Sequence, residues 1–281
     1  MPTSIANQSQ TDADDILWRH LKSVPAFRAL LRSVEARFYQ QMEIAKPVLD
    51  LGCGDGHFAS MAFGARLTAG IDPWWRPLKK AVRAGVYQLP VQSLGSAMPF
   101  PDGTFATVIS NSVLEHIADV QPVLNEAARV LRPGGKLVVT FPNDRFTARL
   151  GGAQWLERIG LPGLAERYRR GFNTIARHAH TDPPQRWRER LENAGLVVEH
   201  WQPYFSVPAL HALELGHYLG LPSFLCHLFT RRWIVAPWRS SLYLTERWLR
   251  PLFEEQLEAG QEGTMLIFVA RKPEDPGRQG S

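Results

Sequence analysis

The chain has 281 residues, an apolar fraction of 44% and a formal net charge of +5. This length and composition fit one large α/β domain, or one domain with an elaboration, and they exclude a mainly disordered chain. The two cysteines, Cys53 and Cys226, lie far apart in the sequence. They cannot form a disulfide framework or a zinc site of the usual spacing, so we expect no metal.

The first 45 residues predict a polar tail followed by a helical cap. Residues 1–15 contain no apolar stretch of the signal-peptide type, which favours a cytoplasmic location. Residues 16–43 carry an apolar stripe at helical spacing that is broken near Pro25. We treat residues 1–45 as one N-terminal unit.

A glycine loop follows a short apolar segment in "VLDLGCGDGHFA", residues 48–59. Val48–Leu51 suits a strand that is buried on both faces. The glycines at positions 52, 54 and 56 allow positive φ and leave no Cβ in the way of a ligand. A helix starting near His57 would point its first N–H groups at the loop. A tight turn without a ligand is the alternative, but the pattern favours the first half of a nucleotide-binding βαβ unit.

A second strand, Leu67–Asp72, ends in an acid that lies 18 residues beyond Gly54. At this place in a βαβ unit, a carboxylate is positioned to accept hydrogen bonds from ribose hydroxyls. Asp-Pro is also a common turn pair, so Asp72 could simply begin a turn. The glycine loop at the right distance upstream favours the ribose interpretation.

Strands and helices continue to alternate as far as residue 143. A helix is predicted over 76–87, and a third strand and a loop lead to a fourth strand at Ala106–Ser110. Residues 120–135 form an amphipathic helix that ends at Pro133-Gly134-Gly135, and residues 136–143 form a fifth strand. This alternation predicts an α/β fold with a doubly wound parallel sheet.

The last part of the chain has a different character. Residues 191–205 read as the end of a helix and a sixth strand, and residues 263–272 as the last strand. Residues 145–250 hold 15 arginines, no lysine and eight acidic residues, a local formal charge of +7. Residues 206–263 then form a helical, aromatic and arginine-rich insertion before the last strand, far longer than an ordinary loop.

The insertion has two interpretations that the sequence leaves open. We favour a helical cap over the domain, with contact to a membrane surface as a secondary property. Glu214 and Pro222 argue against a helix that spans a bilayer. The predicted units are therefore 1–45, a core at 46–205, the insertion at 206–263, and the last strand with a flexible tail at 264–281.

The motifs "VLDLGCGDG", "GIDPW", "MPFPDGTFATVISNSVLEHI" and "VLNEAARVLRPGGKLVVTFPN" resemble class I S-adenosylmethionine-dependent methyltransferases. They are most similar to the methyltransferase type 11 branch, which includes quinone-biosynthesis and many small-molecule methyltransferases. The resemblance covers residues 47–143. It implies a Rossmann-like sheet of seven strands and S-adenosyl-L-methionine as the cofactor, and it says nothing of the substrate.

The resemblance also implies a set of cofactor-binding residues. Asp72 would bind the ribose, Pro73 and Trp74 would flank the adenine, and Asn111 would line the methionine end. Many relatives have an Asp ahead of the "LPF" element, where this chain has Leu94-Gly95-Ser96, so backbone groups around Leu94 would hold the adenine. The full set is Asp50, Gly52, Cys53, Gly54, Asp72, Pro73, Leu94, Asn111 and Ser112.

Two histidines are candidates for a catalytic base. The methyl group of a sulfonium is electrophilic, so the protein chiefly aligns the acceptor, but a hydroxyl acceptor can need a base. His116 follows the loop that lines the cofactor, and His180 precedes the helix at 184–194. Each has a structural alternative, as a helix-capping histidine and as a solvated loop histidine. His57 and Tyr39 are interpreted as packing residues.

The sequence features that suggest other functions are weaker than those for methyl transfer to a small, lipophilic molecule. Arginines among aromatics can bind nucleic acid, but no RNA-binding module is recognisable and "FPND" lacks the Asn-Pro-Pro-Tyr element of many base amino-methyltransferases. Nicotinamide enzymes use G-x-G-x-x-G rather than the spacing found here. A non-catalytic scaffold that binds S-adenosylmethionine remains the alternative. The sequence does not indicate an oligomeric state.

Overall fold

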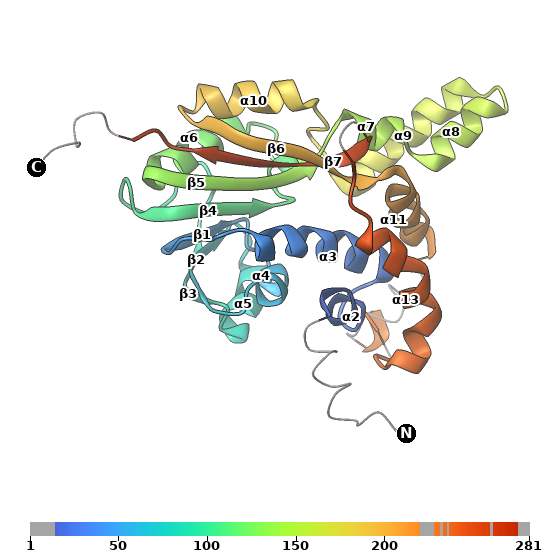
Figure 1. Cartoon of the computed structure of the whole chain (residues 1–281), viewed down its shortest axis with the longest axis horizontal. Helices are drawn as coiled ribbons and strands as arrows, with labels where there is room; N and C mark the ends of the chain where they lie inside the picture. Colours follow the sequence, from blue (N-terminus) through green and yellow to red (C-terminus); the bar gives the residue numbers. More distant parts are fainter. Residues whose placement is uncertain (1–14, 220–227, 231–232, 235, 259–260, 275–281) are drawn as a thin grey trace, which may run out of the picture.

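The computed structural model describes residues 15–219, 228–230, 233–234, 236–258 and 261–274 (Figure 1). The polar tail before residue 15 and Cys226 lie outside the described residues. Seven strands form one sheet: β1 (Val48–Leu51), β2 (Leu67–Asp72), β3 (Tyr87–Gln92), β4 (Phe105–Asn111), β5 (Leu131–Pro142), β6 (Val197–Ser206) and β7 (Gly263–Arg271).

The strands lie in the order β3-β2-β1-β4-β5-β7-β6. β1 pairs in parallel with β2 and β4, whereas β7 runs antiparallel to both β5 and β6. The predicted doubly wound, seven-stranded and mostly parallel sheet is confirmed. Because the parallel strands end at the same edge, the loops after β1, β2 and β4 meet there.

Helices cover both faces of the sheet, with α3, α4 and α5 on one face and α6 and α10 on the other (Figure 1). A further group gathers beyond the carboxyl ends of the parallel strands. The helices are α2 (Ile16–Leu21), α3 (Ala26–Gln41), α4 (His57–Ala62), α5 (Trp75–Ala84), α6 (Gln121–Val130), α7 (Asp144–Ala148), α8 (Gly151–Arg158), α9 (Pro162–Ala176), α10 (Pro184–Asn193), α11 (Val207–Leu219) and α13 (Arg239–Glu254), with a 3-10 turn, η1, at Leu114–His116.

The hydrophobic core has two large parts, one on each side of the sheet. In β1, Val48 belongs to the part beneath α3, and Leu49 belongs to the part beneath α6 and α10. This alternation follows from the pleat, which points successive side chains to opposite faces. Beneath α10, Trp187 stacks on Phe141 of β5 with 3.8 Å between ring centroids.

Several elements differ from their predicted bounds. The N-terminal helix is two helices, and Pro25 is the N-cap of α3. Pro133-Gly134-Gly135 does not follow a helix end as a turn but lies within β5, which begins at Leu131. Leu131 pairs with Phe105, and the register then shifts, so the Pro-Gly-Gly segment is accommodated as an irregularity of the strand.

Helices α7, α8 and α9 occupy residues 144–176, where the sequence analysis predicted no element. Their apolar stripes are thin, since α9 buries only Ala165 and Phe172. Helices α11 and α13 lie between β6 and β7. None of the helices in the described ranges is both long enough and apolar enough to cross a membrane.

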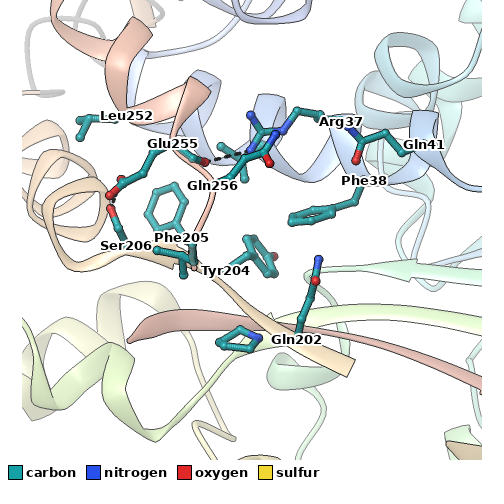
Figure 2. Close-up of a pocket in the computed structure, with 13 residues that line it drawn as sticks. Arg37, Phe38, Gln41, Gln202, Tyr204, Phe205, Ser206, Leu252, Glu255 and Gln256 are labelled. Atoms are coloured by element: carbon teal, nitrogen blue, oxygen red, sulfur yellow. Dashed lines mark hydrogen bonds between the residues drawn. The ribbon is translucent and has the colours of Figure 1, made fainter. Parts of the chain in front are cut away.

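The end of α13 is held against α3 by Arg37. Its guanidinium donates to the carbonyl of Phe253 at 2.6 Å. It also donates to the carbonyl of Glu255 at 3.2 Å (Figure 2). A cavity of about 300 Å³ lies between α3, the end of β6 and this segment. Figure 2 shows Tyr204 among its lining side chains, and Ser206 hydrogen-bonded to Glu255 at one edge of it. These contacts fix the segment between β6 and β7 to the core.

Replacing Trp187 by alanine should destabilise the fold by about 3–5 kcal/mol, because the fully buried ring leaves a cavity against Phe141. Chemical denaturation measures the change in the free energy of unfolding. Trp155→Ala is the matched control, since Trp155 is 60% exposed and its loss should change stability little. Equal effects of the two substitutions would contradict the packing described here.

Candidate active site

Two glycines shape the loop after β1. Gly52 has φ +79°, and a Cβ there would lie 2.4 Å from a methyl carbon of Val113. Gly54 has φ +55°, yet a Cβ there would meet no atom within 4 Å. Gly52 is therefore required by the packing of the protein itself, whereas the backbone of Gly54 faces free space that a ligand can enter.

Asp72 ties the glycine loop to the end of β2. One carboxylate oxygen accepts a hydrogen bond from the backbone N–H of Gly54 at 2.9 Å, and the other accepts from that of Trp74 at 2.8 Å. The side chain is 7% exposed. Each oxygen keeps a lone pair for a further donor, as recognition of a hydroxyl would require.

Asp50 lies beneath the loop with a partner that the sequence did not reveal. The hydroxyl of Tyr87, the first residue of β3, donates to its carboxylate at 2.6 Å. Burial raises the pKa of Asp50 to about 6, and the Tyr87 hydrogen bond opposes this rise. The two residues are 37 positions apart in sequence and meet only because β3 joins the sheet next to β2.

A cavity of about 380 Å³ opens beside Asp72, and we call it the nucleoside cavity. Its lining includes Pro73, Trp74 and the segment from Ser93 to Ser96. Trp74 is 72% exposed and Leu94 is 60% exposed, so both offer apolar surface to a planar group. The predicted Asp72, Pro73 and Leu94 are thus brought to one cavity.

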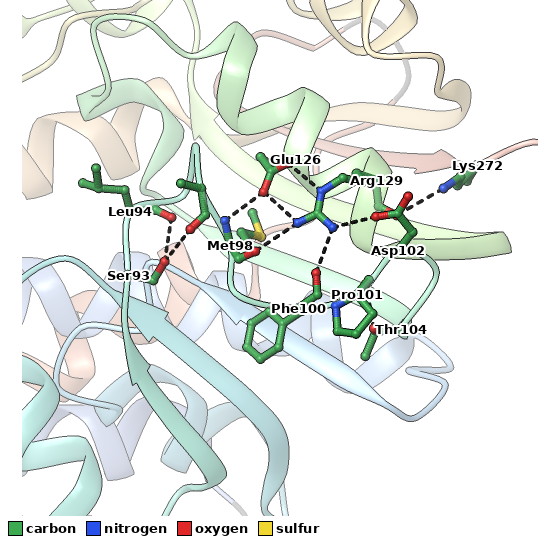
Figure 3. A network of polar contacts seen from close by, with 11 residues as sticks. Ser93, Leu94, Met98, Phe100, Pro101, Asp102, Thr104, Glu126, Arg129 and Lys272 are labelled. Atoms are coloured by element: carbon green, nitrogen blue, oxygen red, sulfur yellow. Dashed lines mark hydrogen bonds and ion pairs between the residues drawn. The ribbon is translucent and has the colours of Figure 1, made fainter.

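The segment that carries Leu94 is held in place by Arg129 of α6 (Figure 3). The guanidinium donates to both oxygens of Glu126, to Asp102 at 2.7 Å, and to the carbonyls of Met98 and Phe100. Glu126 in turn accepts from the backbone N–H of Met98 at 2.8 Å. This network replaces regular secondary structure as the support of the cavity wall between β3 and β4.

A second cavity, of about 140 Å³, lies on the other side of Gly52 and Val113, and we call it the loop cavity. Its lining includes six of the predicted cofactor residues: Asp50, Gly52, Cys53, Gly54, Asn111 and Ser112. Burial is the main cause that raises the pKa of the Cys53 thiol, which keeps it protonated. Cys53 therefore serves here as a small side chain rather than as a nucleophile.

Glu35 of α3 orients Asn111 and Ser112, and sequence reasoning missed it. Its fully buried carboxylate accepts from Asn111 at 2.7 Å and from Ser112 at 2.6 Å. It also accepts from Arg32 at 2.8 Å and from the Tyr204 hydroxyl at 3.1 Å. The only local signal was an acid within the apolar stripe of a helix.

A third cavity, of about 170 Å³, adjoins both others, and we call it the acceptor cavity. It shares His116 with the nucleoside cavity and Ser112 with the loop cavity. Three aromatic rings contribute to its walls, from helices that the chain brings together beyond the sheet: Phe27, Phe146 and Phe172. The lining also includes His178 and His217.

His116 reaches the acceptor cavity in a defined tautomer. Its Nδ1 lies 3.0 Å from the carbonyl oxygen of Arg177, which can only accept, so Nδ1 carries the proton and Nε2 keeps its lone pair. Burial lowers the pKa of His116 and lowers that of His178 to about 4, which leaves both rings uncharged near neutral pH. The two rings stack with centroids 5.6 Å apart.

His180 does not line the acceptor cavity. Its Nε2 lies 3.0 Å from the carbonyl oxygen of Ile117, and its Nδ1 faces Arg190 and Asp182. Both ring nitrogens are thus occupied in holding the loop to the core. His57, expected to pack, contacts the hydroxyl of Ser23 at 2.8 Å, and Tyr39 is buried between aromatic rings.

Glu115 is a second residue that the sequence analysis missed. It lines the acceptor cavity, its side chain is 2% exposed, and its Oε2 has no hydrogen-bond partner within the described part of the chain. Burial raises the pKa of Glu115 to about 8. A carboxyl group of this kind can hold or accept a proton near neutral pH.

Comparison with known proteins shows what part of this chain resembles. Residues 49–139 match the family model described as "Methyltransferase domain", which confirms the predicted resemblance. An uncharacterized methyltransferase of Mycobacterium sp. (strain KMS) is 34% identical over 124 residues, which are 40% of this chain and 49% of that protein. The chain therefore spans about half the length of this relative.

Two further matches extend beyond the family model. The ubiquinone biosynthesis O-methyltransferase of Xanthomonas euvesicatoria pv. vesicatoria (strain 85-10) is 33% identical to this chain. The aligned region covers 54% of this chain and 63% of the length of that enzyme. A methyltransferase structure from Thermotoga maritima, titled as a possible histamine N-methyltransferase, superposes with a TM-score of 0.50. The superposition covers 95% of this chain and 96% of the Thermotoga maritima chain at 15% sequence identity. At this identity the match supports a shared fold only.

Glu115→Gln should flatten the pH dependence of stability. The pKa of Glu115 is raised from 4.5 to about 8, so unfolding releases its proton between these values and stability falls as the pH rises through them. The glutamine of the variant does not titrate in this range. The free energy of unfolding of the variant, relative to that of the parent, should therefore rise by up to about 1.4 kcal/mol per pH unit. Denaturant titrations from pH 5 to about pH 8 measure this. A difference in stability between variant and parent that stays constant across this pH range would contradict the raised pKa of Glu115.

Proposed function

We propose that this chain, whose residues 49–139 form a methyltransferase domain, binds S-adenosylmethionine and transfers its methyl group to a small-molecule acceptor. The observation that carries the proposal is the open space over Gly54, bordered by Asp72 and next to a separate cavity with uncharged histidines. Cofactor and acceptor would then occupy neighbouring cavities that share Ser112 and His116.

The residues around the glycine loop fit this cofactor. Asp72 offers acceptor oxygens to the ribose hydroxyls, and Trp74 and Leu94 offer apolar surface to the adenine. Gly54 lets the backbone approach the ligand, because no side chain stands between them. Asn111 and Ser112, held by Glu35, would line the methionine end. When bound, the cofactor supplies an electrophilic methyl group on sulfur.

The residues of the acceptor cavity would orient the acceptor and transfer protons to or from it. His116 keeps the lone pair of its Nε2 and can accept a proton from a hydroxyl or carboxyl group. Burial raises the pKa of Glu115 to about 8, so near neutral pH this carboxyl group instead holds a proton that it can donate to a bound acceptor. The contacts of His180 give no support to a catalytic role for that residue. The cavity is small and partly aromatic, which favours a small molecule with some apolar surface over a nucleic acid as the acceptor.

A non-catalytic protein that binds S-adenosylmethionine is the alternative. Binding of the cofactor alone fits both proposals, whereas formation of S-adenosylhomocysteine upon addition of a small molecule fits only the enzyme. A screen of small aromatic and lipophilic molecules, read out as S-adenosylhomocysteine, separates the two.

A secondary contact with a membrane surface is supported by α13. Leu244 and Trp248 are 77% and 46% exposed and lie four residues apart, so they share one helix face with the exposed Arg247. Aromatic and apolar side chains beside an arginine suit the interface of an anionic bilayer. The contact would bring the chain close to a source of lipophilic acceptors.

Asp72→Ala should weaken the binding of S-adenosylmethionine and of S-adenosylhomocysteine by about 10- to 100-fold. The substitution removes the charged acceptor oxygens that would bind the ribose, and it releases the glycine loop from its hydrogen bond. Gly54→Ala should also weaken the binding of both ligands, since the Cβ of the alanine would lie in the space over the loop. Calorimetric titration measures these affinities, with NADH as the ligand that should not bind.

The matched control for Gly54→Ala is Gly85→Ala. Gly85 also has a positive φ, of +64°, with open space where a Cβ would stand, but it ends α5 away from the cavities. Both substitutions should cost similar stability, and only Gly54→Ala should reduce cofactor affinity. If the unsubstituted chain binds neither adenosyl ligand, the proposed function is wrong.

The membrane contact predicts that the chain co-sediments with vesicles of anionic phospholipid more than with zwitterionic vesicles, and less at high salt. Leu244→Ser with Trp248→Ser should reduce this co-sedimentation. Trp155→Ser with Ile175→Ser is the control, since these residues are 60% and 69% exposed on α8 and α9. Equal losses from the two pairs would remove α13 as the contact surface.

A further inference from the structure

Two arginines of α3 set the charge of the acceptor cavity, and they differ in how they are paired. Arg32 donates to Glu35 at 2.8 Å, so its charge is compensated by a buried carboxylate. Arg28 lies one turn earlier and lines both the acceptor cavity and the loop cavity. Within the described part of the chain, no carboxylate lies within ion-pair distance of Arg28.

Arg28 is an exposed residue, yet its surroundings disfavour the charge of its guanidinium. Removal of water by the neighbouring protein, and then the positive charge of Arg32, lower the pKa of Arg28. Asp55 acts on it in the opposite direction, from beyond ion-pair distance. A guanidinium in such a place gains most from an anion that supplies both charge and hydrogen-bond acceptors.

The other titratable groups of the cavity do not cancel this charge. Burial raises the pKa of Glu115 to about 8, so near neutral pH its carboxyl group is mostly protonated. Burial lowers the pKa values of His116, His178 and His217, so their rings are uncharged. The cavity therefore presents one uncompensated positive charge among aromatic walls.

We propose that the methyl acceptor is a small aromatic carboxylate, and that Arg28 binds its carboxylate group while the rings of Phe27, Phe146 and Phe172 enclose its apolar part. This inference rests on the proposed function, because it names the substrate class of that same site. An amine acceptor would bring a second positive charge next to Arg28, and a neutral acceptor would leave the guanidinium without a partner.

The bound carboxylate has one other possible source. Arg28 also lines the loop cavity, where the cofactor's methionine carboxylate would lie, so the same guanidinium could bind that group instead. Both candidate ligands of Arg28 are carboxylates, and a cofactor analogue without a carboxylate distinguishes them. Methylthioadenosine carries the nucleoside and sulfur of the cofactor without the amino-acid carboxylate.

The test is a calorimetric titration of the full chain, saturated with S-adenosylhomocysteine, with benzoate, benzamide and benzylamine as probes. Benzoate should bind about 10- to 100-fold more tightly than the neutral benzamide, and benzylammonium should bind most weakly. Arg28→Gln should abolish the preference for benzoate, and Arg28→Lys should retain part of it. Arg76→Gln, at an exposed position of α5, is the control and should change nothing.

Three results would overturn the proposal. One is benzoate binding no more tightly than benzamide, and another is a preference for benzylammonium. The third is a loss of S-adenosylhomocysteine affinity in Arg28→Gln with unchanged affinity for methylthioadenosine and for benzoate, which would assign Arg28 to the cofactor. Thermal unfolding of each variant shows whether the fold is intact.

Failure of the proposed function is recognised separately. If the unsubstituted chain does not bind S-adenosylhomocysteine, the methyltransferase proposal falls, and benzoate titrations without any nucleoside still report on Arg28. A preference for benzoate that Arg28→Gln removes under those conditions would leave a carboxylate site and refute its role in methyl transfer.

Discussion

The buried carboxylate of Glu35 is the interaction on which the site depends. It lies in α3, yet it accepts hydrogen bonds from the end of β4, through Asn111 and Ser112, and from β6, through Tyr204. A buried carboxylate is tolerated only where donors surround it, so α3 must sit over the sheet edge in one position. That position brings Arg28 and Phe27 to the acceptor cavity.

The cavities are separated by single residues rather than by walls of secondary structure. Val113 stands between the nucleoside and loop cavities and touches the position where Gly52 lacks a Cβ. Ser112 holds a positive φ of 50°, and its backbone N–H donates to Thr140. The backbone that turns at the end of β4 therefore decides how cofactor and acceptor would meet. The same turn leads into η1, which carries Glu115 and His116.

The sequence predicted the parts of the site that are local. The glycine loop, Asp72 and the strand ends of β1, β2 and β4 follow from short motifs, because backbone turns and strand-end positions are encoded by neighbouring residues. His180 was chosen by its place in the chain, and the structure shows its ring nitrogens turned toward the loop and α10. Glu35, Tyr87 and Glu115 were missed because their significance arises from partners or burial that the local pattern does not encode.

The sequence by itself determined the alternation of strands and helices as far as residue 143, the parallel sheet and the glycine loop, since hydrophobic periodicity and glycine positions act over a few residues. Only the tertiary structure decided what surrounds each charge. Glu35 pairs with Arg32 within one helix, but the other donors that keep its carboxylate buried come from the end of β4, through Asn111 and Ser112, and from Tyr204 of β6. The physical reason is that the free energy of a buried charge depends on donors and acceptors supplied by distant segments, and chain folding alone brings these together.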